Sequence, residues 1–220
     1  MDAMDVLTNL EHLQPFFQPI FSADEHTVIG YEVLGRYVYE GTIHSLGPFF
    51  LDNSIPEEYR IDVDNIILGL ALERLRDRSD NGSLIFINRD PNLLMIDHGE
   101  KLLNILKDKL GEDQLHRIVI ELAANKFSGE TKSLCHLLNY YRTYGIKIAV
   151  DHLGRDTQLD SVTALSPNIL KVNLDTLSYK AWDTHKDMVD SLGLLARKIG
   201  AVLLFEGIES VYQLQYAWNN

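Results

Sequence analysis

Cysteine, basic side chains and long apolar runs are all scarce in this sequence. Its one cysteine, Cys135, excludes an internal disulfide. The apolar stretch around Cys135 favours a small buried side chain in a reducing compartment over a nucleophile. Lys and Arg number 20 against 32 Asp and Glu, so the net charge is −12. A surface that acidic argues against a nucleic-acid-binding protein, whose binding face must be basic. It does not exclude a small anionic ligand, because bound divalent cations reverse the local field.

The lack of long apolar runs argues against membrane insertion of this segment. No run approaches the ~20 residues that a helix needs to span a bilayer. The N-terminal residues have neither a basic start nor a long apolar segment, so they do not resemble a secretory signal peptide. We therefore expect a cytoplasmic protein. No low-complexity tract, charge block or linker interrupts the chain, so residues 1–220 are expected to form one domain.

Six short apolar runs stand out from the rest of the chain. Each is rich in Val, Ile, Leu or Phe without polar alternation, which is the pattern of a strand buried on both faces of a parallel sheet. Each also ends on, or next to, a polar residue that could bind a metal. The runs are Thr27–Glu32, Leu84–Asn88, Arg117–Glu121, Lys147–Asp151, Ile169–Asn173 and Ala201–Glu206.

The polar residues at these strand ends suggest a common site. A buried carboxylate is costly to desolvate unless it is paired or metal-bound. If the strands form a barrel, their ends meet at one rim, where barrel enzymes carry out their chemistry. The side chains expected at that rim are Glu32, Asn88, Glu121, Asp151 and Glu206.

Strand and helix patterns alternate from Leu84 onward, which predicts βαβ units and a parallel α/β sheet. Upstream, Phe16–Phe21 and Thr27–Tyr37 predict two strands joined by the turn Ser22–His26. Helical spacing predicts helices over Asp62–Arg76, Pro91–Met95, Glu100–Leu110, Thr131–Tyr144, Ser161–Leu165, Asp187–Ile199 and Ser210–Trp218, with Gly145 and Gly200 ending two of them.

Seven predicted strands are one fewer than a closed (β/α) barrel of ~250 residues contains. We therefore expect an α/β fold of TIM-like barrel type that is incomplete at its C-terminus. Either the native chain continues past Asn220, or the barrel closes by other means. An unpaired barrel edge would favour dimerisation.

Glu32–Arg36, Glu-Val-Leu-Gly-Arg, resembles the E-A-L-x-R signature of EAL domains, the bacterial cyclic di-GMP phosphodiesterases. Further segments match family motifs in the same order along nearly the whole chain. They are Gln18–Ile20, Asn88, Glu121-Leu122, Asp151–Gly154, Leu170–Asn173 and Glu206–Ser210. The resemblance implies a TIM-like barrel with an irregular first hairpin.

The resemblance also implies a two-metal site, in which cations about 4 Å apart activate a water and stabilise the leaving oxygen. Hard oxygen ligands suit Mg²⁺ or Mn²⁺. By resemblance, Glu32, Asn88, Glu121 and Asp151 ligate the first metal. The catalytic set would be Glu32, Asp151, Lys171 and Glu206. Lys171 would orient the water or the phosphate, and Glu206 would serve the metal pair directly or through water. Cyclic di-GMP would contact Gln18, Arg36, Lys171 and Glu209, with the planar fork of Arg36 clamping a phosphate oxygen.

Three departures from the family pattern fall on the second metal and on the loop after the Asp151 strand. The family's second aspartate of D-D-F-G is His152, which supplies a neutral nitrogen. The glutamate that by resemblance braces the loop and supports dimer-linked activation is Ala124, and the loop Arg155–Asp160 lacks the family's G-Y-S. Asn173 replaces an aspartate, and a final Q-G-Y motif is absent. In these losses the chain resembles a degenerate subgroup, formed by some Gram-positive EAL proteins with a C-terminal sensor domain.

Three functions remain open from the sequence. The leading hypothesis is a degenerate EAL domain that binds cyclic di-GMP with a divalent cation and hydrolyses little or none of it, acting as a homodimer. The second is an active phosphodiesterase in which His152 serves as a metal ligand. The third is a scaffold that binds neither and works by dimerising or by docking a partner. Turnover separates the first two, and ligand affinity separates the first from the third.

Overall fold

The computed structural model describes residues 2–76, 82–96, 99–123, 130–153, 157, 159–174 and 182–219, with only the backbone described for residues 182–185. The chain forms two compact units. The first comprises Met1–Ile87 and Ile96–Ile118, and the second comprises Asn88–Met95 and Val119–Asn220. Within the described residues, no helix is both long enough and apolar enough to cross a bilayer.

The first unit is built on an antiparallel hairpin of β1 (Leu13–Phe21) and β2 (Val28–Tyr39). β3 (Thr42–Ser45) pairs with β2 antiparallel, and the first residues of β4 (Leu84–Arg89) pair with β2 in parallel. Gly30 permits this last pairing, because a Cβ there would lie 2.7 Å from the carbonyl oxygen of Leu84.

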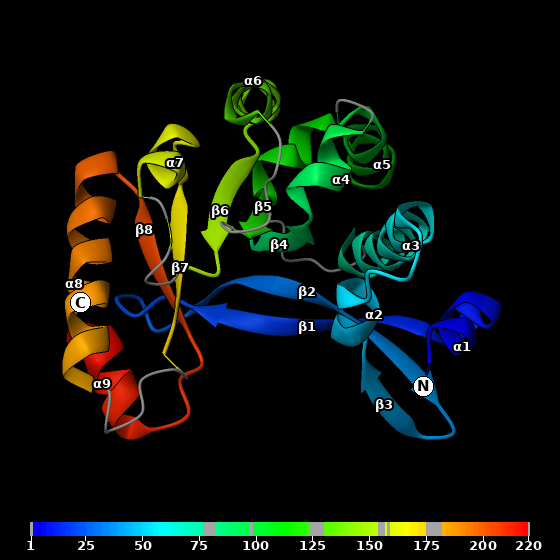
Figure 1. The fold of residues 1–220 in the computed structure, drawn as a ribbon, viewed down its shortest axis with the longest axis horizontal. Coiled ribbons are helices and arrows are strands. Elements are labelled where there is room, and N and C mark those ends of the chain that lie inside the picture. Colours follow the sequence, from blue (N-terminus) through cyan, green and yellow to red (C-terminus); the bar gives the residue numbers. More distant parts are fainter. Residues whose placement is uncertain are drawn as a thin grey trace. The chain divides into compact units, whose positions relative to one another are not determined.

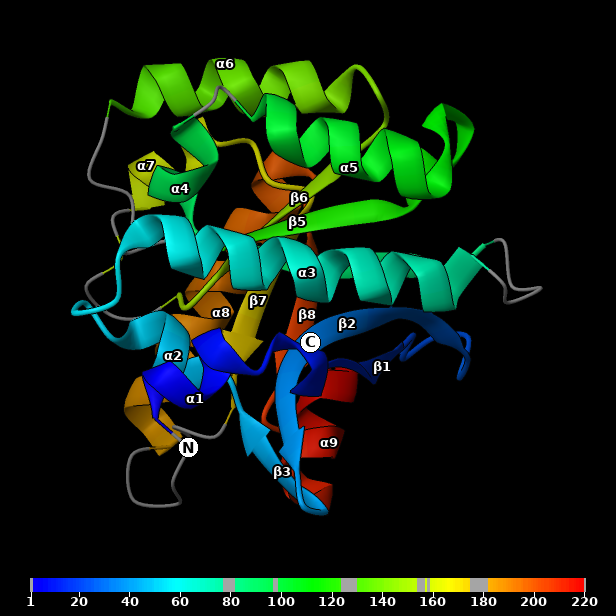
Figure 2. The same cartoon turned by 90° about the vertical axis from the view of Figure 1, so that its right-hand side faces the viewer.

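Helices cover this hairpin on the side of the apolar core. The long helix α3 (Glu57–Arg76) packs between β1 and α5 (Glu100–Leu110), as Figure 2 shows. α3 contributes buried Ile67, Leu68, Ala71, Leu72 and Leu75 to the core. The remaining elements are α1 (Ala3–Thr8), α2 (Gly47–Leu51) and the 3-10 turns η1 (Leu10–His12) and η2 (Glu112–Arg117).

The second unit is a parallel sheet of β5 (Ile118–Ala123), β6 (Lys147–Asp151), β7 (Ile169–Asn173) and β8 (Val202–Glu206), in that order (Figure 1). Its helices are α4 (Pro91–Met95), α6 (Thr131–Arg142), α7 (Leu159–Ala164), α8 (Trp182–Ile199) and α9 (Val211–Asn219). Apolar residues of β6, β7 and α8 form its core, including Val150, Leu170, Val172, Val189 and Leu192.

The predicted hairpin, the later strands and the helix order are confirmed. Ser22 and Thr27 close the turn through a backbone hydrogen bond of 2.9 Å. Gly200 follows the last residue of α8 with φ of 73°, as expected. α6 ends at Arg142 with Thr143 at its C-cap, and Gly145, with φ of 79°, lies two residues further on. The sequence did not indicate β3, whose four residues are too short for a clear pattern.

Three expectations need correction. The helix expected from Asp62 begins at Glu57, because two glutamates in the first turn favour its positive N-terminus. β8 is not buried on both faces, since Val202 is 66% exposed. Cys135 is half-buried rather than buried, and its thiol donates a hydrogen bond to the carbonyl of Ala164 at 3.3 Å.

Candidate functional site

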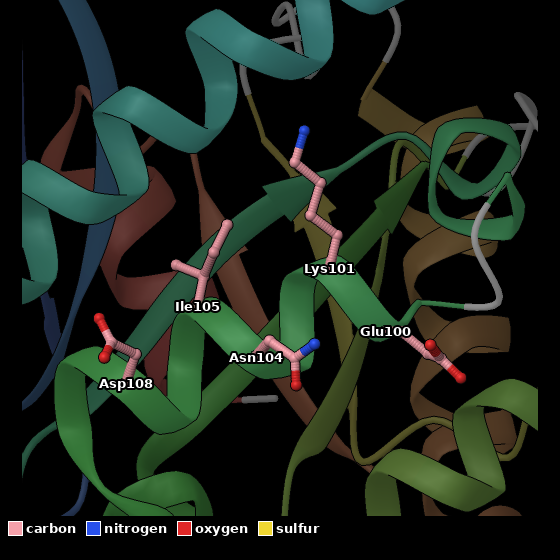
Figure 3. A pocket seen from close by; sticks show the side chains of 5 residues that line it. All are labelled: Glu100, Lys101, Asn104, Ile105 and Asp108. Carbon is pink, nitrogen blue, oxygen red and sulfur yellow. The ribbon is translucent and has the colours of Figure 1, made fainter.

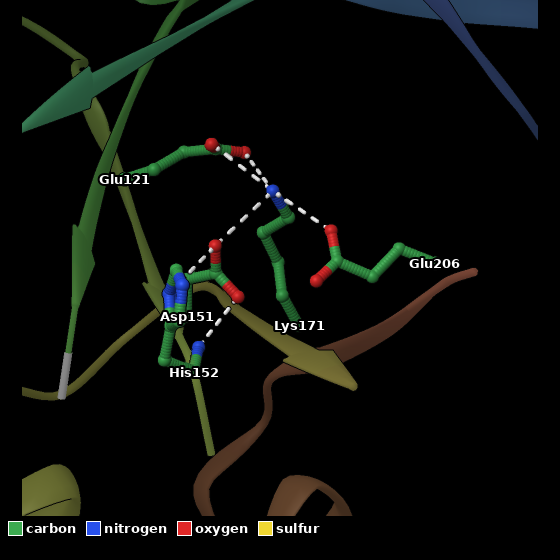
Figure 4. A network of polar contacts seen from close by, with 5 residues as sticks. All are labelled: Glu121, Asp151, His152, Lys171 and Glu206. Atoms are coloured by element: carbon green, nitrogen blue, oxygen red, sulfur yellow. Dashed lines mark hydrogen bonds and ion pairs between the residues drawn. The ribbon is translucent and has the colours of Figure 1, made fainter. Parts of the chain in front are cut away.

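A cluster of four charged side chains lies at the carboxyl ends of the strands in the second unit. The Nζ atom of Lys171 lies 3.0 Å and 3.1 Å from the two carboxylate oxygens of Glu121. The same Nζ lies 3.5 Å from Oδ2 of Asp151 and 3.3 Å from Oε2 of Glu206. Figure 4 shows the three carboxyl groups pointing toward the single ammonium. We call these four residues the Lys171 cluster.

Strand register explains why residues from four separate strands meet here. Side chains alternate between the faces of a sheet, so residues paired across strands share a face. Ala123 of β5 pairs with Asp151, which places Glu121, two residues earlier, on the same face. Asn173 of β7 pairs with Glu206, which places Lys171 on that face as well. Val150 of β6 pairs with Leu170, which sets Asp151 beside Lys171. The register between the strands therefore fixes the cluster.

Burial makes the charges of the Lys171 cluster depend on one another. The side chains of Lys171 and Glu121 are 1% and 0% exposed, whereas those of Asp151 and Glu206 are 8% and 26% exposed. Three carboxylates and one ammonium carry a net charge of −2 when all are ionised. A buried charge is tolerated only when it is paired, so the ammonium and the carboxylates stabilise each other.

Asp151 is held in its ionised form. Burial raises the pKa of this carboxyl, but hydrogen bonds from His152 and the positive charge of Lys171 outweigh that effect, and its pKa lies below the usual value. The backbone amide of His152 donates to Oδ1 of Asp151, and the imidazole Nδ1 lies 3.3 Å from Oδ2. The imidazole is 64% exposed, so it occupies the solvent side of the cluster.

Two other predicted residues of the second unit lie at the same ends of their strands as the Lys171 cluster. Asn88 is an exposed residue near the end of β4. Glu209 is exposed in the segment after β8, and its backbone amide donates to Oε1 of Gln213 at 2.8 Å. The structure thus places Asn88 and Glu209 in the same compact unit as the cluster.

Gln213 is a helix-capping residue that the sequence-based reasoning missed. Its Oε1 accepts hydrogen bonds from the amide and hydroxyl of Ser210 at 2.9 Å and 3.0 Å, and its Nε2 donates to the carbonyl of Leu174 at 3.1 Å. Ser210 Oγ in turn accepts from the Gln213 amide at 3.2 Å. This is a capping box, and its S-x-x-Q signature at Ser210–Gln213 could have revealed it. Gln213 thereby ties the segment after β8 to the segment after β7.

The remaining predicted site residues belong to the first unit. The hairpin register pairs Gln18 with Glu32 and Gln14 with Arg36, so Gln18, Glu32 and Arg36 share one face. Gln18 is exposed, whereas Glu32 and Arg36 are half-buried. The guanidinium of Arg36 donates to the carbonyl of Gly35 at 2.9 Å and lies 6.0 Å from the ring centre of Phe16.

The donor set of the Lys171 cluster fits a hard divalent cation. Its carboxylate oxygens are the ligands that Mg²⁺ and Mn²⁺ prefer. Among the described residues, however, no group of three or more His, Cys, Asp or Glu side chains is arranged as a metal site, and Lys171 lies between the carboxylates instead. Of the predicted first-metal set, Asn88, Glu121 and Asp151 belong to the second unit and Glu32 to the first.

Some predicted positions lie outside the described residues. Ala124 is one of them. Within the predicted loop Arg155–Asp160, only Thr157, Leu159 and Asp160 are described. The expectation that this region has lost its support for the second metal therefore stays a prediction.

An open hollow of about 510 Å³ lies along α5 in the first unit (Figure 3). It is lined by Glu100, Lys101, Asn104, Ile105 and Asp108. One of these, Lys101, forms an exposed ion pair with Asp62 at 3.4 Å. None of the predicted site residues lines this hollow, so it gives no support for a second ligand site.

Comparison with known proteins gives a consistent result along the whole chain. The family model described as EAL domain matches residues 3–220. The EAL-domain containing protein YkuI of Bacillus subtilis is 50% identical over 223 residues, which cover 100% of this chain and 54% of that protein. The chain therefore spans about half the length of this relative.

Solved structures agree with the predicted α/β fold of TIM-like barrel type. The crystal structure of YkuI, in complex with substrate cyclic di-GMP and calcium, matches with a TM-score of 0.93 over 100% of this chain and 55% of that one. The PaMucR phosphodiesterase in complex with cyclic di-GMP is 17% identical, with a TM-score of 0.84 over 100% of this chain and 92% of that one. An EAL domain protein from Listeria monocytogenes EGD-e, also 17% identical, has a TM-score of 0.82 over 100% of this chain and 88% of that one. The two more distant structures speak for the fold alone.

Proposed function

This chain belongs to the EAL domain family, and from that premise we propose that it binds cyclic di-GMP together with a divalent cation and hydrolyses little or none of it. One observation carries the proposal. Three carboxylates from three strands gather around Lys171 with a net charge of −2, which one divalent cation would neutralise. The crystal structure of the 50% identical YkuI, which contains cyclic di-GMP and calcium, supports the choice of ligand.

Each residue has a role in this proposal. Glu32, Asn88, Glu121 and Asp151 would hold the cation, for which we propose Mg²⁺ or Mn²⁺. When bound, the cation supplies Lewis acidity and neutralises phosphate charge. Arg36 contributes a planar donor fork for a phosphate oxygen. Gln18 and Glu209 would provide polar contacts to the nucleotide. Lys171 would orient a water or a phosphate oxygen, and Glu206 would serve the metal directly or through water.

Weak hydrolysis follows from the residue beside Asp151. Hydrolysis of a phosphodiester is fastest when two cations hold the attacking water oxygen and the leaving ester oxygen. A second cation needs additional anionic ligands, and His152 offers a neutral nitrogen on an exposed side chain. Lys171 can still orient a water or a phosphate oxygen, which leaves slow turnover chemically possible.

An active phosphodiesterase is the second candidate. The sequence contains all four residues of the expected catalytic set: Glu32, Asp151, Lys171 and Glu206. In the YkuI complex, cyclic di-GMP is described as the substrate of that protein. In this alternative His152 is itself a metal ligand. We also propose that the protein forms a homodimer and is located in the cytoplasm.

A calorimetric titration with cyclic di-GMP tests the proposal directly. We expect binding in Mn²⁺ or Mg²⁺ that weakens at least tenfold in EDTA, and no substantial linear dinucleotide after prolonged incubation. Rapid formation of the linear product favours the active enzyme. Absence of binding under both conditions contradicts the proposal and leaves the scaffold function.

A further inference from the structure

Lys171 has three carboxylate partners and almost no contact with water. Its side chain is 1% exposed, and its Nζ lies within 3.5 Å of oxygens from Glu121, Asp151 and Glu206. An ammonium has three donor hydrogens, so it can direct one to each carboxylate. The ammonium therefore occupies the position that a cation would take among these carboxylates.

We infer that Lys171 is an internal counter-ion that competes with the divalent cation for Glu121, Asp151 and Glu206. This inference rests on the proposed function, because it concerns the same cation. In the metal-free protein the ammonium keeps the three carboxylates together. A carboxylate lone pair that ligates the cation can no longer accept a hydrogen bond from Lys171. Metal affinity is therefore lower than the carboxylates alone would give.

The charge balance gives the expected direction. With Lys171 the cluster carries −2, and without it the same side chains carry −3. Removal of the ammonium leaves buried carboxylates that repel one another, which destabilises the metal-free fold. The same removal strengthens the attraction for a divalent cation. Metal affinity and metal-free stability should therefore change in opposite directions.

A role limited to orienting water or phosphate predicts something different. In that case Lys171 would matter only when the nucleotide is bound. Its substitution would weaken cyclic di-GMP binding or turnover and would leave Mn²⁺ affinity unchanged in the absence of nucleotide. Measurements without nucleotide therefore separate the two roles.

The test uses the Lys171→Met variant, which keeps a chain of similar length without the charge. We expect Mn²⁺ to bind this variant at least tenfold more tightly than the parent by calorimetry without nucleotide. Its melting temperature should be lower than that of the parent in EDTA and should recover in saturating Mn²⁺, because a ligand that binds only the folded state stabilises it. Lys171→Arg, which retains the charge, should have the parent's Mn²⁺ affinity to within a few-fold.

Lys109→Met is the matched control, because Lys109 forms an ion pair of 2.6 Å with Glu73 at a more exposed position in the first unit. It should change neither Mn²⁺ affinity nor the Mn²⁺ effect on melting. If Lys171→Met does not fold in EDTA, refolding from denaturant decides the question. If the variant refolds in Mn²⁺ but not in EDTA, the result supports the competition. If it refolds to the same extent in both, or in neither, the result contradicts the competition.

Failure of the inference can be told apart from failure of the proposed function. If the parent and Lys171→Met bind Mn²⁺ equally, Lys171 does not compete, and the proposed cation site stands. If neither binds Mn²⁺, the cation part of the proposed function is wrong, and the inference falls with it.

Discussion

His152 donates a hydrogen bond from its backbone amide to the side chain of the residue before it, Asp151. This bond forms with His152 in the left-handed region, at φ 57°, and the imidazole Nδ1 then lies 3.3 Å from Oδ2 of the same carboxylate. His, Asp and Asn all occupy this region more often than most residues. Substitutions among the three therefore change the side chain beside Asp151 with little change in backbone strain.

The first prediction is that His152→Asp increases hydrolysis of cyclic di-GMP in Mn²⁺. The substitution places a second anionic oxygen ligand beside Asp151, which favours binding of a second cation. Adding Ala124→Glu should increase turnover further, because by family resemblance that glutamate supports the following loop. The rate of formation of the linear dinucleotide, measured by chromatography, checks both variants.

His152→Asn is the control for this prediction, since it has the same backbone tolerance without the negative charge. It should not raise turnover. A His152→Asp variant that hydrolyses more slowly than the parent would instead show that the imidazole is a working ligand. Rapid hydrolysis by the parent would contradict the same prediction.

The second prediction concerns Arg36. Arg36→Ala should weaken cyclic di-GMP binding by about 1.5–3 kcal/mol, the usual contribution of a charge-assisted contact. That corresponds to a dissociation constant roughly 10- to 150-fold higher. Arg36→Lys should lose part of this, because a lysine cannot form the planar bidentate contact. Titration calorimetry in Mn²⁺ provides the measurement.

Arg197→Ala is the matched control, because Arg197 is an exposed residue in the last turn of α8. Its affinity for cyclic di-GMP should equal that of the parent. If Arg36→Ala binds as tightly as Arg197→Ala, Arg36 does not contact the phosphate.

The third prediction concerns the first metal. In a crystal grown with Mn²⁺, anomalous scattering should place one cation at about 2.0–2.6 Å from oxygens of Glu32, Asn88, Glu121 and Asp151. Four oxygen ligands from separate strands suit a hard cation that takes several ligands, with water completing its coordination. A cation bound without Glu32 or Asn88 would remove those residues from the proposed ligands.

The fourth prediction concerns Gln213, which bonds both Ser210 and the carbonyl of Leu174. Gln213→Ala should lower the free energy of unfolding by about 1–2 kcal/mol, because it removes a capping partner and a bond between segments. Gln215→Ala is the control, since Gln215 is exposed on the same helix. Urea denaturation of both variants checks the difference, and equal midpoints would contradict it.

The sequence predicted the second unit better than the details of the site. Runs such as Lys147–Asp151 gave the strands, because parallel strands with two buried faces have a distinctive composition. The same runs placed Glu121, Asp151 and Glu206 at strand ends, and the structure brings them together. The pairing of all three with Lys171 was not predicted, because it depends on register between strands, which single runs do not specify.

The short elements were missed for a related reason. β3 and α1 have four and six residues, too few for a hydrophobic period to be recognised. The exposure of Val202 was also not predicted, because an apolar run has the same composition in an end strand as in a central one.

The last prediction concerns Tyr216 of α9, whose hydroxyl donates to Oδ1 of Asp190 at 3.2 Å. Burial, followed by the negative charge of Asp190, raises the pKa of Tyr216 from 10.0 to about 12. Between these values the unfolded chain loses the proton first. The free energy of unfolding should therefore include the full contribution of Tyr216 below pH 10 and lose it as the pH rises toward 12.

Urea unfolding at about pH 9 and about pH 11, on either side of the unfolded tyrosine's pKa, should show a smaller loss of stability in Tyr216→Phe than in the parent. Tyr59→Phe, which removes an exposed hydroxyl from α3, should lose as much as the parent. Equal losses in all three proteins would show that the Tyr216 hydroxyl is not held by Asp190.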